Sequence, residues 1–150
     1  MPTRPAVFLD TSALFAGIWS ATGGARMILK LCEAGVIRLV ASPHVLQELE
    51  GALRRKAPET LGLFALLLDR SRLEVTAPSS EESLKKALAL TGHAGDARVL
   101  AAALDIGVDF LVTLDQKHML EATALRSAMP FLVGTPGDFL GWVRGKLVEG

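Results

Sequence analysis

The sequence is poor in the residues that bind zinc or form disulfides. Its 150 residues include one cysteine, three histidines and no tyrosine. A single cysteine cannot form an intramolecular disulfide, and it excludes the usual cysteine-based zinc sites. Cys32 lies among apolar residues at helical spacing, so we predict that it belongs to the core. The histidines His44, His93 and His118 lack the spacing of metal ligands, and we expect them at the surface or beside a site.

Neither sign of charge is in excess, and long hydrophobic runs are absent. Lysine plus arginine and aspartate plus glutamate each number 16, and the sequence pI is about 6.8. Nucleic acid would therefore have to bind through a local patch or a metal. The longest uncharged segment, residues 11–25, contains three glycines and is too short to cross a membrane. Asp10 interrupts the first apolar run, which argues against an export signal. We expect a cytoplasmic protein without a membrane segment.

Several catalytic motifs are also absent. The sequence has no phosphate-binding loop of the G-x-x-x-x-G-K-[ST] type and no dinucleotide-binding G-x-G-x-x-G. Ser12 lacks the glycines of a nucleophile elbow, and no histidine has an evident pairing with it. These absences argue against P-loop nucleotide hydrolysis, dinucleotide chemistry and serine-based hydrolysis.

The sequence does show the alternation of strand and helix patterns that is typical of an α/β domain. Half of the residues are apolar and the mean hydropathy is +0.37, so we expect one folded domain over residues 1–150. Short apolar runs predict strands at residues 6–10, 36–41, 73–76, 109–113 and 131–133. Helical patterns predict helices at residues 24–34, 43–56, 58–69, 80–90, 94–106, 117–122 and 136–148. This alternation predicts a parallel sheet with helices on both faces.

Capping residues mark the start of two of these helices. Ser42 can cap the helix that begins at Pro43, a residue favoured in the first helical position. Ser79 and Glu82 have the spacing of a capping box, which predicts that Ser79 caps the helix over residues 80–90.

Two carboxylates follow predicted central strands. Asp10 ends the first strand, and Asp115 lies just beyond the fourth. Ligand sites in open α/β sheets lie beyond the carboxyl ends of the strands. Either residue alone is equally well explained as a cap of the following helix or turn. Two such residues at one edge of the sheet favour a functional site.

Two further carboxylates lie on predicted helices. Glu48 falls on the flank of the apolar face of the helix over residues 43–56, and the residues three and four positions ahead offer it no partner. Asp96, near the start of the helix over residues 94–106, projects onto the middle of that helix's apolar face. An interaction with the first helical amides accounts for the position of Asp96 but does not require its inward direction.

The convergence of these four carboxylates would create a metal site. Like charges in one cleft raise each other's pKa, so removing one of them should relieve repulsion. Oxygen ligands without cysteine or histidine suit Mg²⁺ or Mn²⁺. Two such ions about 4 Å apart can hold the attacking water and the leaving oxygen of a phosphodiester. The pattern predicts a metal-dependent nuclease.

Four segments that contain these carboxylates follow one another along the chain: Asp10-Thr-Ser, Ser42-Pro-His-Val-Leu-Gln-Glu48-Leu, Gly95-Asp96-Ala-Arg-Val-Leu-Ala-Ala-Ala103 and Leu111-Val-Thr-Leu-Asp115. In their order and spacing the chain resembles the PIN domain family over residues 6–136, and most of all its branch of VapC-related toxin components. Each segment alone is a weak signal, whereas four in order and on the expected elements are specific.

The resemblance implies a three-layer α/β/α sandwich whose five-stranded parallel sheet has the order 3-2-1-4-5. It implies Mg²⁺- or Mn²⁺-dependent cleavage of RNA, homodimerisation and, for a toxin, neutralisation by a small antitoxin. The implied catalytic and metal-binding residues are Asp10, Glu48, Asp96 and Asp115, with the hydroxyls of Thr11, Ser12 and Thr113 supporting them. Some relatives carry a further acidic residue after the last of these, whereas Gln116, Lys117 and His118 follow here. The number of cations, one or two, therefore stays open.

Two other functions remain compatible with the sequence. A non-catalytic PIN-like module could bind RNA or a protein, although a pure binding surface has no need for clustered carboxylates. A metal-dependent phosphatase or DNA nuclease could use the same site. The dimer surface is also open: the apolar helix around residues 61–68 and the C-terminal helix are candidates, and both could instead be core.

Overall fold

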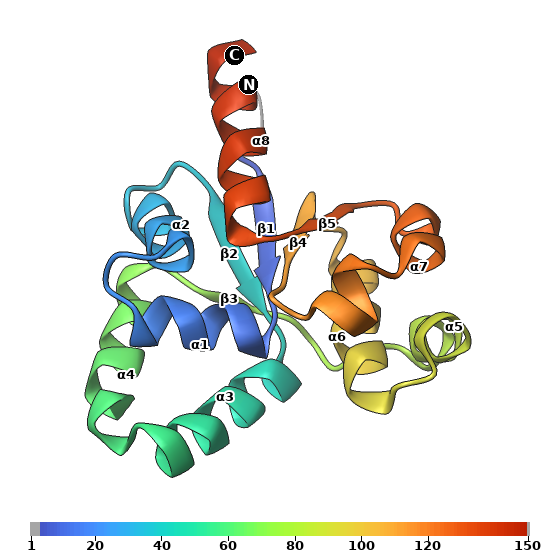
Figure 1. The fold of residues 1–150 in the computed structure, drawn as a ribbon, viewed down its shortest axis with the longest axis horizontal. Helices are drawn as coiled ribbons and strands as arrows, with labels where there is room; N and C mark the ends of the chain where they lie inside the picture. Colours follow the sequence, from blue (N-terminus) through green and yellow to red (C-terminus); the bar gives the residue numbers. More distant parts are fainter. Residues whose placement is uncertain (1–3, 150) are drawn as a thin grey trace.

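The fold is built on one five-stranded sheet (Figure 1). The computed structural model describes residues 4–149. The strands are β1 Ala6–Leu9, β2 Arg38–Ala41, β3 Glu74–Val75, β4 Phe110–Val112 and β5 Leu132–Gly134. All neighbouring strands are parallel, and their order is β3-β2-β1-β4-β5. The predicted strands and the implied strand order are therefore confirmed.

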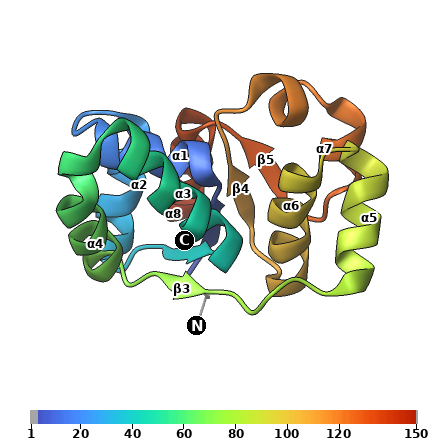
Figure 2. The same ribbon diagram turned by 90° about the horizontal axis from the view of Figure 1, so that it is seen from below.

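Helices cover both faces of the sheet. They are α1 Thr11–Trp19, α2 Gly24–Glu33, α3 Pro43–Lys56, α4 Leu61–Arg70, α5 Glu81–Thr91, α6 Ala94–Ile106, α7 Thr123–Ala128 and α8 Pro136–Glu149. Figures 1 and 2 show α1, α2 and α8 on one side of the sheet and α5 and α6 on the other, which confirms the three-layer α/β/α sandwich. Within residues 4–149, no helix combines the length and the apolar character that crossing a membrane requires.

Capping residues set where two of the helices begin. Ser42 caps α3 through its hydroxyl, and Pro43 takes the first helical position, as predicted. The prediction that Ser79 caps α5 is wrong, because the cap is Ser80. Asp105 of α6 accepts hydrogen bonds from the amide and the hydroxyl of Ser80, at 2.6 and 2.9 Å. These bonds fix Ser80 in the capping position and tie the start of α5 to α6.

Two helical regions differ from the predictions. The sequence pattern predicts no helix over residues 11–19, whereas the structure has α1. This helix carries no charged residue, so no polar face marks it, and Gly17 lets it pack closely against Leu29 of α2. The short helix predicted at residues 117–122 is present as one wide turn of π-helix, Gln116–Leu120, which α7 follows. In that turn the amides of Leu120 and Glu121 donate to carbonyls five residues earlier, which is the π-helical pattern.

The core lies on both faces of the two central strands. Every residue of β1 and β4 is buried, which explains why their sequences lack polar–apolar alternation. Phe110, Phe139 and Trp142 form an aromatic cluster between β4 and α8. Cys32 is buried in α2, as predicted, and burial raises the pKa of its thiol to about 12. The central strands are thus rigidly held, and their ends can position a site.

Gly134 in β5 lies so close to α8 that no larger side chain fits there. An added Cβ would lie 2.9 Å from the Cβ of Asp138 and 3.1 Å from the Cζ of Phe110. We expect Gly134→Ala to lower the free energy of unfolding by about 1–3 kcal/mol, the usual cost of overpacking, in urea denaturation. The control is Gly62→Ala in α4, where an added Cβ meets nothing within 4 Å and alanine favours the helix. Equal stabilities of the two variants would contradict this prediction.

Candidate active site

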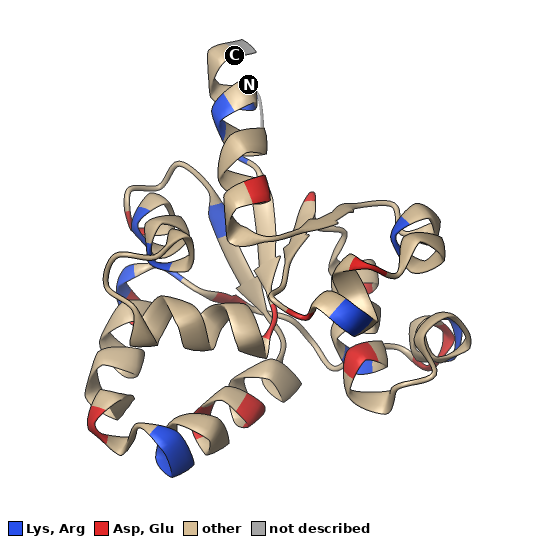
Figure 3. Cartoon of the chain, viewed as in Figure 1, with Lys and Arg blue, Asp and Glu red and all other residues tan. Residues whose placement is uncertain are grey.

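A cleft lies at the carboxyl edge of the sheet, between β1 and β4. The chain passes from β1 to β2 on one side, and β4 lies on the other, so the strand order switches here. We call this cavity of about 180 Å³ the acidic cleft. Its lining residues are Asp10, Thr11, Ser12, Glu48, Gly95, Asp96, Val99 and Asp115. Figure 3 shows acidic positions, in red, gathered where β1 and β4 end and on the helices that face them.

Asp10 is the most deeply buried of the four carboxylates. It follows β1 directly and caps α1, because its Oδ1 accepts the amide of Ala13 at 3.0 Å. The same oxygen accepts the hydroxyl of Ser12 at 2.7 Å, and Oδ2 accepts the hydroxyl of Thr113 at 2.5 Å. Burial raises the pKa of Asp10, and these hydrogen bonds offset part of that increase. Asp10 is therefore both a helix cap and a carboxylate of the cleft.

Two hydroxyl groups connect the ends of β1 and β4. Thr113 is fully buried, and its hydroxyl accepts the amide of Asp115 at 3.0 Å while it donates to Asp10. Ser12 accepts the amide of Leu114 at 3.0 Å and also donates to Asp10. The backbone at the end of β4 is thereby locked to the carboxylate at the end of β1.

Asp96 and Asp115 of the cleft form a tight group of potential metal ligands with His118. One ligand atom from each lies within 4.8 Å of the others, and His118 Nδ1 is 3.6 Å from Asp96 and 3.5 Å from Asp115. Asp115 also caps the wide turn that carries His118, by accepting its amide at 3.1 Å. The carboxylate of Asp96 accepts no hydrogen bond from a residue in the described range. Burial and the charge of Asp115 raise the pKa of Asp96, and His118 and His93 offset part of this.

Glu48 reaches the cleft from α3. Its Oε1 accepts the hydroxyl of Thr11 at 3.0 Å, and Nε2 of His44 lies 3.1 Å from the same oxygen without the angle of a hydrogen bond. The inference that Glu48 has no helical partner is wrong. The residues three and four positions after Glu48 offer no partner, whereas His44 lies four residues before it on the same face of α3.

Histidines contribute more to this region than their sequence spacing indicates. His118 is part of the tight group with Asp96 and Asp115, and its ring centroid lies 4.0 Å from that of His93. The contact between Asp115 and His118 could have been predicted from their spacing, because a capped turn brings residues three positions apart close together. The contact of His118 with Asp96 of α6 could not be predicted in this way, because the two residues are far apart in the sequence.

The donor set fits a divalent cation. Among the described residues no lysine or arginine lines the acidic cleft, and the imidazoles of His44 and His118 lie within 4 Å of its carboxylates. The tight group offers two carboxylates and one imidazole nitrogen. The imidazole departs from the expected set of oxygen ligands alone: Mg²⁺ and Mn²⁺ take the carboxylates, and an imidazole nitrogen also suits other transition metals.

Solved structures with the same fold include two VapBC proteins and a VapC toxin. VapBC2 from Rickettsia felis, bound to a DNA fragment from its promoter, is 18% identical with a TM-score of 0.63, over 86% of this chain and 96% of that one. DNA-bound VapBC from Salmonella typhimurium is 20% identical with a TM-score of 0.62, over 87% and 97%. VapC20 from Mycobacterium tuberculosis, a toxin that cleaves the sarcin–ricin loop, is 18% identical with a TM-score of 0.54, over 75% and 92%. At these identities the likeness establishes the fold.

Sequence comparison identifies the family directly. No curated protein sequence gives a significant match. The family model described as PIN domain matches residues 6–117, which is most of the chain and spans β1 to β4 with all four carboxylates of the acidic cleft. The chain therefore belongs to the PIN domain family.

Proposed function

We propose that this protein is a Mg²⁺- or Mn²⁺-dependent endoribonuclease that works as a single PIN domain. The observation that carries the proposal is the acidic cleft, a cavity of about 180 Å³ that is lined by carboxylates from four separate segments. Among the described residues, no lysine or arginine lines it. Such a cluster is unfavourable by itself, since like charges disfavour each other's ionised form. A site that binds a divalent cation and a phosphodiester accounts for it.

Each polar residue of the cleft has a role in this proposal. Asp96, Asp115 and His118 would hold the cation, and Asp10 and Glu48, which line the same cleft, complete the proposed metal site. A bound divalent cation would polarise a phosphate oxygen, help to ionise the attacking water and stabilise the charge that develops on the phosphate. The hydroxyls of Ser12 and Thr113 hold Asp10 by both oxygens, and Thr11 holds Glu48. These hydrogen bonds fix the carboxylates before substrate binds.

We further propose that the protein is the toxin of a toxin–antitoxin pair, with an antitoxin protein as partner and a homodimer as its assembly. Support comes from the solved VapBC2 and VapBC structures with DNA and from VapC20, a toxin that cleaves RNA of the sarcin–ricin loop. The substrate class of the proposal, RNA, follows from the same likeness together with the family.

Cleavage of labelled RNA tests the proposal. Mn²⁺ or Mg²⁺ should permit cleavage, EDTA should stop it, and Asp115→Asn should lower kcat/KM by about 100-fold or more. The reason is that a metal supplies several kcal/mol of transition-state stabilisation, and about 1.4 kcal/mol corresponds to a tenfold change in rate. Asp69→Asn is the matched control, because Asp69 is an exposed carboxylate on α4 outside the cleft.

Two other substrates, assayed in parallel, test whether the activity is specific for RNA. Single-stranded DNA and a phosphate monoester, assayed in the same buffer, should react more slowly than RNA. Faster reaction of either would contradict the proposed substrate. RNA that binds but stays intact with both metals would contradict the nuclease and favour the non-catalytic binding module.

A further inference from the structure

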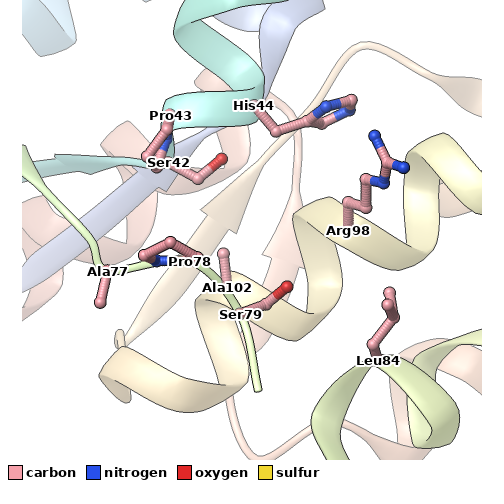
Figure 4. A pocket seen from close by; sticks show the side chains of 9 residues that line it. All are labelled: Ser42, Pro43, His44, Ala77, Pro78, Ser79, Leu84, Arg98 and Ala102. Carbon is pink, nitrogen blue, oxygen red and sulfur yellow. The ribbon is translucent and has the colours of Figure 1, made fainter. Parts of the chain in front are cut away.

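A second cavity lies beside the acidic cleft, between α3, α5 and α6 (Figure 4). Its volume is about 190 Å³. Figure 4 shows the imidazole of His44 and the guanidinium of Arg98 on one side of it. The apolar part of its wall comes from Pro43, Pro78, Leu84 and Ala102.

This cavity and the acidic cleft share two helices. On α3, His44 lines the cavity and Glu48, one turn later, lines the cleft, with 3.1 Å between His44 Nε2 and Glu48 Oε1. On α6, Asp96 lines the cleft and Arg98 lines the cavity. A strand of RNA whose phosphate lies in the cleft would therefore bring a neighbouring nucleotide to this cavity.

We propose that this cavity, the base pocket, binds one nucleobase of single-stranded RNA next to the phosphodiester that is cleaved. The proposal rests on the proposed function and names the part of the substrate that the site recognises. The volume is below the roughly 300–1,000 Å³ of pockets for drug-sized ligands, which suits a single ring system. Unstacked RNA bases bind to apolar, histidine and arginine surfaces, and the base pocket offers all three.

The backbone beside the base pocket can bind the edge of a base. In the part of the chain that the structure describes, no hydrogen bond engages the peptide groups of residues 77–79, which line the pocket. The segment is nevertheless fixed at both ends. The amide of Thr76 donates to the carbonyl of Ala41 at 2.9 Å, and the amide of Ser80 donates to Asp105 at 2.6 Å. Free donors and acceptors held in place suit a base, whose edge carries both.

Arg98 supplies the positive charge that the acidic cleft lacks. It is exposed and forms no ion pair with any residue from 4 to 149, and no carboxylate lines the base pocket. The carboxylates of the cleft repel RNA phosphates, and a free guanidinium at the neighbouring base pocket can bind a phosphate. An apolar pocket with an unpaired cation at its side favours a nucleotide over an apolar peptide.

RNA binding by the metal-free protein in EDTA and low salt tests the base pocket without cleavage. Fluorescence anisotropy compares labelled hexauridylate with a chain of six abasic ribose phosphates. The wild type should bind hexauridylate about tenfold more tightly, the usual scale of stacking one base. Ala102→Leu, which fills the pocket without changing charge, should remove this preference, and Arg98→Ala should weaken hexauridylate binding about tenfold. Arg70→Ala, an exposed arginine on α4, should change neither.

The results for the variants distinguish a failure of the base pocket from a failure of the proposed nuclease. A folded Ala102→Leu variant that keeps the wild-type preference for bases would overturn the base pocket and make a protein segment the candidate occupant. If that variant does not fold, Arg98→Ala decides, since an exposed side chain can be truncated safely, and unchanged binding would overturn the proposal. Base-dependent binding of RNA that is never cleaved with Mn²⁺ or Mg²⁺ would overturn the nuclease and leave the base pocket supported.

Discussion

Replacing Asp10 by alanine should abolish metal-dependent RNA cleavage and lower the free energy of unfolding by about 2–4 kcal/mol. Asp10 is 7% exposed and accepts hydrogen bonds from Ser12, Ala13 and Thr113. A buried donor left without an acceptor costs about 1–3 kcal/mol, and a lost helix cap costs about 1 kcal/mol. Removing a buried negative charge, whose pKa burial raises, offsets part of this cost.

Two smaller changes separate the effect of the hydrogen bonds to Asp10 from the effect of its negative charge. Asp10→Asn keeps the size, but the amide has one acceptor oxygen where the carboxylate uses two, so its NH₂ group must face a donor. Thr113→Val keeps all four carboxylates and removes the buried hydroxyl between Asp10 and the amide of Asp115. We expect both variants to lose about 1–3 kcal/mol of stability. Thr113→Val should lose less activity than Asp10→Ala, because the carboxylates remain.

Guanidinium denaturation followed by circular dichroism, together with the RNA assay, measures both effects. Ser42→Ala is the comparison for stability, since it removes another buried helix cap that makes a single side-chain hydrogen bond to an amide, at a cost of about 1 kcal/mol. An Asp10→Ala protein as stable as the wild type would contradict the hydrogen-bond network. An active Asp10→Ala protein would contradict the metal site.

Much of the fold follows from local patterns. The strands β1 and β4 were predictable because they are continuous apolar runs, and α3 because a cap, a proline and an amphipathic pattern agree. Helix α1 was not predictable in this way, since it carries no charged residue and is buried by packing against α2 and α3. The strand order came from the family resemblance, because periodicity does not say which parallel strands are neighbours.

The candidate site shows a different limit. From the sequence, capping and function compete as explanations of Asp10 and Asp115, whereas in the structure each residue caps a helical segment and also lines the cleft. A carboxylate has two oxygens, so one residue can serve both purposes. The place of His118 beside Asp96 depends on the packing of a wide turn against α6, which no local pattern encodes.

The base pocket could not be predicted from the sequence at all. Its walls come from the start of α3, the segment after β3 and the middle of α6, which are far apart along the chain. Arg98 alone reads as an ordinary exposed residue of α6. Only the fold shows that it lines an apolar cavity and that no carboxylate of residues 4–149 pairs with it.

Mn²⁺ at about 100 times its Kd should raise the Tm of the wild type by about 5–10 °C and leave that of Asp96→Asn nearly unchanged. Such an excess of a ligand that binds only the folded state contributes about 2.7 kcal/mol, and each kcal/mol shifts the Tm by about 2–4 °C at this size. Asp96 is a better target than Asp10, because its carboxylate accepts no hydrogen bond from residues 4–149 and the side chain of the N-cap residue of α6, His93, makes no capping hydrogen bond. Asp69→Asn should keep the full shift.

Without metal, lowering the pH from 7 towards 4 should stabilise the wild type more than Asp96→Asn. Burial, and then the charge of Asp115, raise the pKa of Asp96 above 3.8, so the folded state binds its proton more tightly than the unfolded chain. This contribution is fully present below the unfolded pKa and is lost as the pH rises through the raised pKa. The lowered pKa of Asp105 acts in the opposite direction in both proteins and cancels in the difference.

The shift caused by Mn²⁺ should have the opposite dependence and grow from pH 5 to pH 7, because the cation binds the ionised carboxylates. The pH dependence of stability without metal and the pH dependence of the Mn²⁺ shift together distinguish a metal site from a group of unrelated helix caps. In a metal site both effects must be lost in the same variant, Asp96→Asn. A shift of equal size at both pH values, or in both proteins, would mean that Mn²⁺ binds elsewhere. The carboxylates of the acidic cleft would then be caps and partly buried charges, and the nuclease proposal would lose its chemical basis.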